Sequence, residues 1–166
     1  MKQSMLSGKR ILAVDDEREV LAVLREEVLM TCPDCKVDEA TSYETAADLL
    51  RSQNYDIVVL DIMGVRGFDL LELAVSRNFK VAMLTAHALS SDALKRAFDM
   101  KARAYLPKQK LGQIVPFLED LFKYEYLPGW KHLYEKLKGF FDSKFESDWE
   151  KKTGLNWQEW GKLGPP

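Results

Sequence analysis

A short, uninterrupted apolar run that ends in an acid constrains the fold of this chain more than any other feature. Residues 57–60 are all branched and apolar, and Asp61 follows them directly. Such a run is typical of a strand that is buried on both faces of a sheet. In open α/β sheets, ligands gather at the carboxyl ends of such strands. A carboxylate at that place is a metal ligand, a nucleophile or one half of an ion pair.

Similar strand patterns alternate with helical patterns along the rest of the first 123 residues. The other strand patterns cover residues 11–14, 37–40, 81–84 and 104–106. A helical spacing of apolar residues follows each of the five strands, which predicts an α/β fold with helices on both faces of a parallel sheet. The doubly wound, flavodoxin-like strand order is 2-1-3-4-5. Asp38 and Glu39 interrupt their strand, which favours an edge position for it.

Local signals predict where several helices begin and end. Pro128-Gly129 is expected to end the helix before it. Three pairs of residues have the spacing of an N-terminal capping box: Thr41 with Glu44, Ser147 with Glu150, and Asn156 with Glu159.

Residues 124–166 differ in character and are expected to form a helical C-terminal extension to a domain of residues 1–123. All four tryptophans lie in this segment, together with Phe140, Phe141 and Phe145. So many aromatic side chains need a covering surface. Either the helices fold back onto their own chain, or they form a homodimer or protein-partner surface.

Charge argues against nucleic acid as the partner of the extension. Residues 123–166 contain eight lysines, no arginine and seven acids, so the segment has a net charge of 8 − 7 = +1. A DNA-binding domain needs a concentrated basic face. We therefore expect protein contact and no DNA binding.

We expect a cytoplasmic protein. Its net charge is −2, which implies no general attraction to nucleic acid or anionic membranes. We expect no signal peptide and no membrane span, because no apolar run is long enough. Cys32 and Cys35 form a C-x-x-C pair, but no second pair completes a zinc site. A plain loop is favoured there over a redox or metal role.

Polar residues at the predicted strand ends suggest a site for phosphoryl chemistry. Asp15 and Asp16 follow the first strand, Asp61 the third, Thr85 the fourth and Lys108 the fifth. Three carboxylates in one crevice repel one another unless a cation joins them, and hard oxygen ligands suit Mg²⁺. A lysine and a hydroxyl beside that metal are typical of phosphoryl transfer.

Four stretches at these strand ends, ILAVDDE, VVLDIM, MLTAHA and AYLPK, resemble the response-regulator receiver domains of two-component signalling, including the chemotaxis receivers. The resemblance covers about residues 8–123. It implies that Asp61 is the phosphoacceptor and that a sensor histidine kinase or a phosphotransfer protein is the donor. It also implies several further roles: Asp15, Asp16, Asp61 and the Met63 carbonyl as Mg²⁺ ligands, Thr85 and Lys108 as contacts of the phosphoryl group, and Thr85 and Tyr105 as switch residues.

The resemblance implies a switch and not an enzyme with a separate substrate. Phosphorylation would bias a protein-interaction surface over the fourth and fifth helices. Two alternatives remain: a receiver-like scaffold that is not phosphorylated, and a phosphatase with an aspartyl nucleophile. The phosphatase would need a second acid two residues after the first, where this chain has Met63.

The chain departs from the family pattern at two places. The loop after Asp61 reads IMGVRG, which is about two residues short and has no proline. Gln109 follows Lys108, where the family usually has proline, often after a cis bond. A cis bond before a residue other than proline costs about 2.5–4 kcal/mol. We therefore expect a trans Lys108-Gln109 bond and a rearranged start to the fifth helix.

Overall fold

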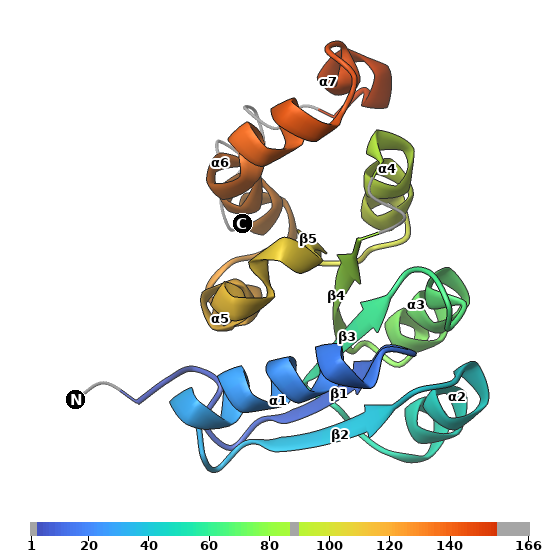
Figure 1. The fold of residues 1–166 in the computed structure, drawn as a ribbon, viewed down its shortest axis with the longest axis vertical. Helices are drawn as coiled ribbons and strands as arrows, with labels where there is room; N and C mark the ends of the chain where they lie inside the picture. The colour runs from blue at the N-terminus through green and yellow to red at the C-terminus, as the bar shows by residue number, and fades with distance from the viewer. Residues whose placement is uncertain (1–2, 87–89, 156–166) are drawn as a thin grey trace.

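The structure is a computed structural model that describes residues 3–86 and 90–155. Five parallel strands form one sheet in the order β2-β1-β3-β4-β5, so the predicted doubly wound topology is confirmed (Figure 1). The strands are β1 (Arg10–Val14), β2 (Lys36–Ala40), β3 (Ile57–Asp61), β4 (Lys80–Thr85) and β5 (Ala104–Pro107).

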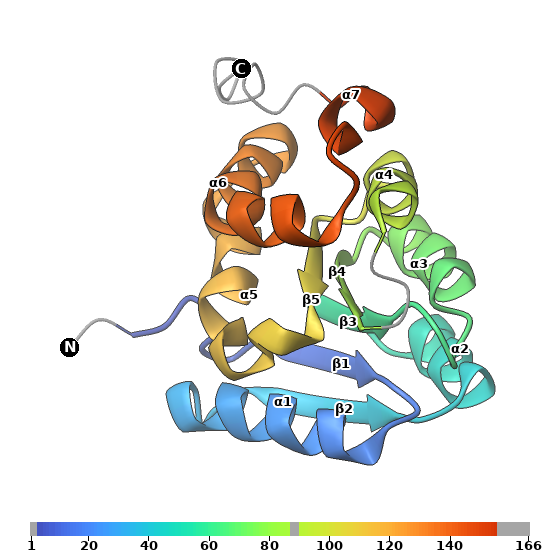
Figure 2. The same ribbon diagram turned by 45° about the horizontal axis from the view of Figure 1, so that its top comes forward.

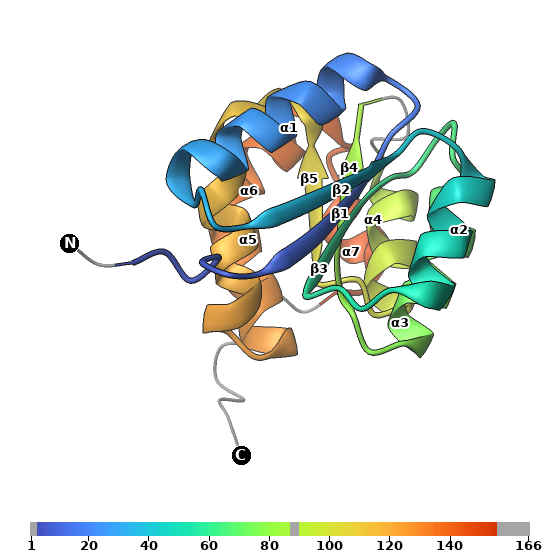
Figure 3. The same ribbon diagram turned by 90° about the horizontal axis from the view of Figure 1, so that it is seen from below.

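Helices cover both faces of this sheet. One face carries α1 and α5, and the other carries α2, α3 and α4 (Figure 3). The helices are α1 (Arg18–Thr31), α2 (Tyr43–Ser52), α3 (Gly67–Ser76), α4 (Ser91–Asp99), the 3₁₀ turn η1 (Lys108–Gln113), α5 (Ile114–Lys123), α6 (Tyr126–Lys144) and α7 (Trp149–Thr153).

The position of each strand in the sheet explains its burial. All five residues of β3 are buried, as expected for the central strand of a covered parallel sheet. In β2, by contrast, Val37 and Ala40 are buried whereas Lys36 and Glu39 are exposed. The predicted edge position of β2 is therefore confirmed.

The opposite edge strand, β5, is buried along its whole length. Helix α6 packs beside it and against α5, while α7 packs on α4 (Figure 2). An uncovered edge strand would present unpaired main-chain groups to solvent. The C-terminal helices thus close the edge of the sheet that the first 123 residues leave open.

Aromatic side chains of the extension face the rest of the chain. Trp130 and Phe141 are 0% exposed and Trp149 is 1% exposed. For the described part of the extension, the alternative in which its helices fold back onto the same chain is confirmed. Trp157 and Trp160 lie outside the described residues.

Two of the predicted helix caps are wrong, and the third, Asn156 with Glu159, lies outside the described residues. Helix α2 is capped by Ser42, not Thr41: it begins at Tyr43, and the Thr45 N–H donates to the Ser42 hydroxyl at 3.3 Å. The N-cap residue of α7 is Asp148 and not Ser147. This start follows from the burial of Trp149 against the aromatic side chains of α6.

The predicted break at Pro128-Gly129 is also wrong. Both residues lie inside α6, and the Gly129 N–H donates to the Glu125 carbonyl at 2.8 Å. Proline is tolerated in the first turn of a helix, because the N–H that it lacks would have no partner within the helix. The break between α5 and α6 lies earlier in the chain, at Tyr124, whose backbone is extended.

The start of the fifth helix agrees with its prediction. There is no cis peptide bond among the described residues, so the Lys108-Gln109 bond is trans. The 3₁₀ turn η1 begins at Lys108 and precedes α5. Within the described ranges, every helix is too short or too polar to span a bilayer.

Candidate functional site

The strand register brings the predicted site residues to one edge of the sheet. Val14 pairs with Leu60, so Asp15 and Asp61 both follow a paired position on neighbouring strands. On the other side of β3, Asp61 pairs with Leu84, which directly precedes Thr85. Thr85 in turn pairs with Pro107, and Lys108 comes next. Residues that are far apart in sequence thus meet because parallel strands end together.

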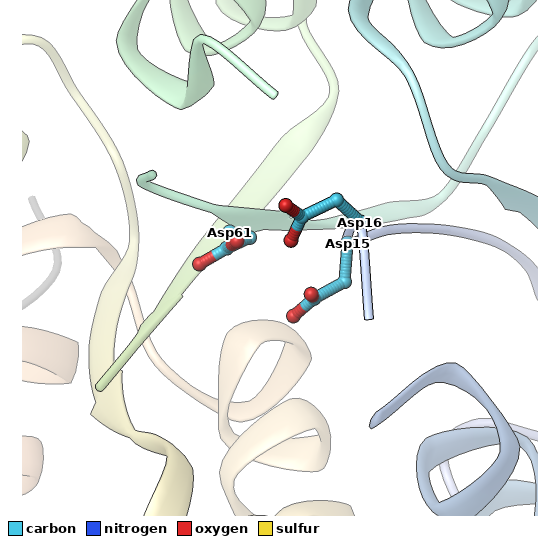
Figure 4. A group of neighbouring side chains, drawn as sticks. All are labelled: Asp15, Asp16 and Asp61. Atoms are coloured by element: carbon cyan, nitrogen blue, oxygen red, sulfur yellow. The ribbon is translucent and has the colours of Figure 1, made fainter. Parts of the chain in front are cut away.

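Three carboxylates converge at this edge. Asp15, Asp16 and Asp61 each place one oxygen so that the three atoms lie within 4.8 Å of one another (Figure 4). Asp15 and Asp61 are buried, whereas Asp16 is exposed. One side of the cluster is therefore open to solvent.

Lys108 is the cation of the site. Its Nζ lies 2.9 Å from Asp15 Oδ2, 3.1 Å from Glu17 Oε1 and 3.4 Å from Asp61 Oδ1. Three carboxylates thus lie within 3.4 Å of the Lys108 ammonium group, and Asp16, which converges with Asp15 and Asp61, is the fourth acid of the site. If all are ionised, the site has a charge of 1 − 4 = −3.

Burial, together with the neighbouring charges, shifts the pKa of two of these acids and of the lysine. Burial, and then the charge of Asp15, raises the pKa of Asp61 to about 6. Burial also raises the pKa of Asp15, although Lys108 opposes the effect. Burial acts to lower the pKa of Lys108, but the hydrogen bond to Asp15 and the charge of Asp61 raise it overall. The ionised forms of Asp15 and Asp61 are thus destabilised in this cluster.

The geometry fits a hard divalent cation. Asp15 Oδ2 is buried, and the Lys108 ammonium group 2.9 Å away is the partner that stabilises it. Three converging carboxylate oxygens and an uncompensated negative charge are what Mg²⁺ requires, and one exposed side leaves room for its water ligands. Among the described residues, Asp15, Asp16 and Asp61 therefore form a group that could hold Mg²⁺.

The short loop after β3 is shaped by two glycines. Gly64 has φ +84°, and a Cβ built on it would lie 2.7 Å from Asp16 Cγ. A Cβ on Gly67 would lie 2.7 Å from Ile62 Cα and would therefore clash with the backbone of Asp61 and Ile62. Arg66 has φ 54° and stacks on the Tyr43 ring at 4.0 Å. The shortened loop therefore turns back tightly under the site without proline.

The remaining predicted site residues differ in their exposure. Thr85 is 0% exposed at the end of β4, whereas the Met63 side chain, in the loop, is 53% exposed. Tyr105 is also 0% exposed and lies beneath α6, where its ring is 6.2 Å from that of Phe141. The predicted switch aromatic is thus covered by the C-terminal extension.

Sequence reasoning missed one acid of the site, Glu17. Its carboxylate holds Lys108, and its main-chain N–H donates to Asp15 Oδ1 at 2.9 Å. Its position directly after Asp15-Asp16 was the available signal.

The C-x-x-C pair takes no part in the site. Cys32 and Cys35 are free, buried thiols in the turn between α1 and β2. The Cys35 thiol donates to the Leu6 carbonyl at 2.7 Å, and burial raises its pKa to about 11. Neither cysteine belongs to the acidic group that could hold a metal in the described part of the chain.

The fold of this chain is found in solved receiver domains. A CheY-like response regulator receiver domain protein from Methanospirillum hungatei matches with a TM-score of 0.57 and 23% identity, covering 70% of this chain and 98% of that one. A two-component response regulator of the LuxR family from Aurantimonas matches with a TM-score of 0.62 and 26% identity, covering 70% of this chain and 86% of that one.

Curated relatives and a family model point the same way. The sensory transduction protein LytT of Bacillus subtilis is 35% identical over 104 residues, which are 60% of this chain and 42% of the relative. The two-component response regulator ARR18 of Arabidopsis thaliana is 35% identical over 92 residues, 53% of this chain and 14% of the relative. The chain thus spans less than half of these relatives. The model of the response regulator receiver domain matches residues 11–117, and this chain therefore belongs to the receiver-domain family of two-component response regulators.

Proposed function

We propose that this protein is a phosphorylation-driven switch in which Asp61 accepts a phosphoryl group from a sensor histidine kinase or a phosphotransfer protein. The observation that carries the proposal is the surroundings of Asp61. Its buried carboxylate lies 3.4 Å from Lys108 Nζ and converges with two other acids on one solvent-open point. A nucleophile, a cation for the transferred oxygens and a set of metal ligands are thus present together.

In the proposed step, an oxygen of Asp61 forms a bond to phosphorus while the bond from phosphorus to the donor histidine nitrogen breaks. The electron pair of that bond leaves with the imidazole. Mg²⁺, when bound by the three acids and the Met63 carbonyl, supplies positive charge for the transferring group. Lys108 and Thr85 bind the phosphoryl oxygens afterwards.

The raised pKa of Asp61 suits this role. The ionised carboxylate of Asp61 is poorly stabilised in the free protein, so it becomes more stable when a cation or a new bond relieves its repulsion with Asp15. We propose no other substrate: the chain would promote only its own phosphorylation and the loss of its own phosphoryl group.

We propose that the switch signals through protein–protein contact. We propose residues 1–123 as the receiver and residues 124–166 as its helical extension, with Thr85 and Tyr105 carrying the switch between them. In the described part of the extension, four lysines make ion pairs with acids: Lys131, Lys136, Lys138 and Lys152. A DNA-binding role finds no support in such a surface.

Phosphorylation of the full chain by acetyl phosphate with Mg²⁺ tests the proposal, with intact mass as the readout. We expect the mass of one phosphoryl group on the wild type and none on Asp61→Asn. Asp69→Asn is the matched control, because Asp69 is an exposed acid on α3 that pairs with Arg66. It should be phosphorylated like the wild type.

An Asp61→Asn variant that still gains the phosphoryl group would show that another residue is the acceptor. A wild type that gains none, despite a native circular dichroism spectrum, would favour the unphosphorylated scaffold. Turnover of added phosphate esters would instead favour the phosphatase.

A further inference from the structure

The C-terminal helices occupy the face formed by α4 and β5. The Trp130 indole N–H donates to the Ala102 carbonyl at 3.0 Å, just before β5. Trp130 also packs on Phe98 of α4, with ring centroids 5.5 Å apart. Figure 2 shows α6 beside β5 and α7 beside α4, so one continuous segment spans this face.

An aromatic cluster forms the centre of the contact. Phe141, Phe145 and Trp149 have ring centroids 5.1–5.8 Å apart, and all three are buried. Helix α7 has only five residues, too few to be stable alone. It is therefore held by docking, and such an element can open without unfolding the whole domain.

A chain of hydrogen bonds runs from β5 to this segment through the first turn of α4. The Ser90 N–H donates to the Tyr105 hydroxyl at 3.1 Å, and that hydroxyl donates to the Ser90 carbonyl at 3.2 Å. Ser90 caps α4. The next residue, Ser91, is buried and donates to Glu146, which lies between α6 and α7.

Tyr105 is therefore linked to the segment in two ways, directly through Phe141 and indirectly through Ser90 and Ser91. Its ring packs against Phe141 and its hydroxyl holds the turn that binds Glu146. It also lies only three residues before Lys108, which is bonded to the acids of the site. Any shift of Lys108 or of the end of β4 toward a group on Asp61 pulls on the same strand and turn.

We propose that α6 and α7 are an intramolecular ligand of the α4–β5 face and that phosphorylation of Asp61 weakens their docking. The inference rests on the proposed function. The docked segment fills the space over Tyr105, so movement of that ring away from Phe141 opens a cavity or breaks the hold on Glu146. Since coupling between two sites is reciprocal, loosening the segment must also favour phosphorylation.

Hydrogen exchange of the full chain, with and without acetyl phosphate and Mg²⁺, tests this coupling. Intact mass on the same samples measures the phosphorylated fraction. We expect peptides from 126–153 to exchange at least about 5-fold faster in the phosphorylated protein, the lower end of typical allosteric coupling. Peptides from α2, which lies away from the α4–β5 face, should not change.

A pair of variants tests the reverse direction. Glu146→Ala removes the acceptor of Ser91, whereas Glu135→Ala removes an exposed acid of α6 that pairs only with Lys131 among the ion pairs of the described residues. Without phosphodonor, Glu146→Ala should speed exchange in 126–153, and with phosphodonor it should raise the initial rate of phosphorylation. Glu135→Ala should do neither. Unchanged exchange in α2 will show that both variants are folded.

The outcomes separate the two proposals. Full phosphorylation with unchanged exchange in 126–153 would overturn this inference and leave the proposed function intact. The same holds if Glu146→Ala loosens the segment without changing the rate of phosphorylation. Absence of any phosphoryl mass would overturn the proposed function, and this inference with it.

Discussion

Replacing Asp61 by asparagine should make the magnesium-free protein more stable at neutral pH. The pKa of Asp61 rises from 3.8 to about 6 on folding, because the carboxylate is buried beside Asp15. Between these values the folded state holds a proton that the unfolded state has lost, so the free energy of unfolding falls as pH rises. Above about pH 7 nearly the whole loss is present. About two pKa units correspond to about 3 kcal/mol.

Asparagine has a similar shape and no proton to lose, so Asp61→Asn escapes this loss. In EDTA at pH 8, urea unfolding should give a free energy of unfolding up to about 3 kcal/mol above the wild-type value. At pH 4.5 the advantage should shrink to roughly a third of that, because most of the titration lies above this pH. The attraction between Asp61 and Lys108 lowers the pKa of Asp61, and the value of about 6 already includes this effect.

Magnesium and a matched variant complete the test. Excess Mg²⁺ should stabilise the wild type more than Asp61→Asn, because a ligand that binds only the folded state adds stability by mass action. The exposed acid Asp69 provides the control, and Asp69→Asn should differ little from the wild type at either pH. An Asp61→Asn variant that is no more stable than the wild type at pH 8 in EDTA, or whose advantage does not shrink at low pH, would refute the electrostatic argument.

Three further substitutions test other contacts. Gly67→Ala should destabilise the protein by about 1–3 kcal/mol, since its Cβ would meet backbone, whereas Gly112→Ala, with nothing within 4 Å, should not; equal urea midpoints would contradict this. Glu17→Gln should raise the initial rate of phosphorylation, because it removes an ion pair that holds the site lysine, Lys108. A half-exposed ion pair is worth up to about 1 kcal/mol, so the rate should rise by up to about 5-fold. A slower rate would show that Glu17 assists phosphorylation. Phe141→Ala should lower the free energy of unfolding by about 3–5 kcal/mol and the partly buried Phe140→Ala by clearly less, and similar losses would mean that the aromatic cluster does not anchor the extension.

Local patterns were sufficient to predict the sheet and to predict which polar residues follow the ends of neighbouring strands. The apolar run before Asp61 identifies a central strand, and the charged residues of β2 identify an edge strand. Both can be predicted locally, because a strand that is buried on both faces is apolar throughout, whereas a partly exposed strand also contains polar residues. Helix starts were predicted less well. At Thr41 the capping spacing was present, but the helix begins one residue later, and Ser42 takes the role.

What the sequence by itself determined is which residues stand at the ends of strands, and hence which side chains can meet at one edge of the sheet. Tertiary structure alone decided which of them interact. Glu17 and Lys108 lie 91 residues apart, and no local pattern reports that their side chains are 3.1 Å apart. The aromatic residues of the extension showed that a covering surface was needed, but not which one. The extension covers the face of α4 and β5, where the sheet would otherwise have an open edge. Tyr105 and Phe141 are neighbours because segments that are distant in the chain pack together.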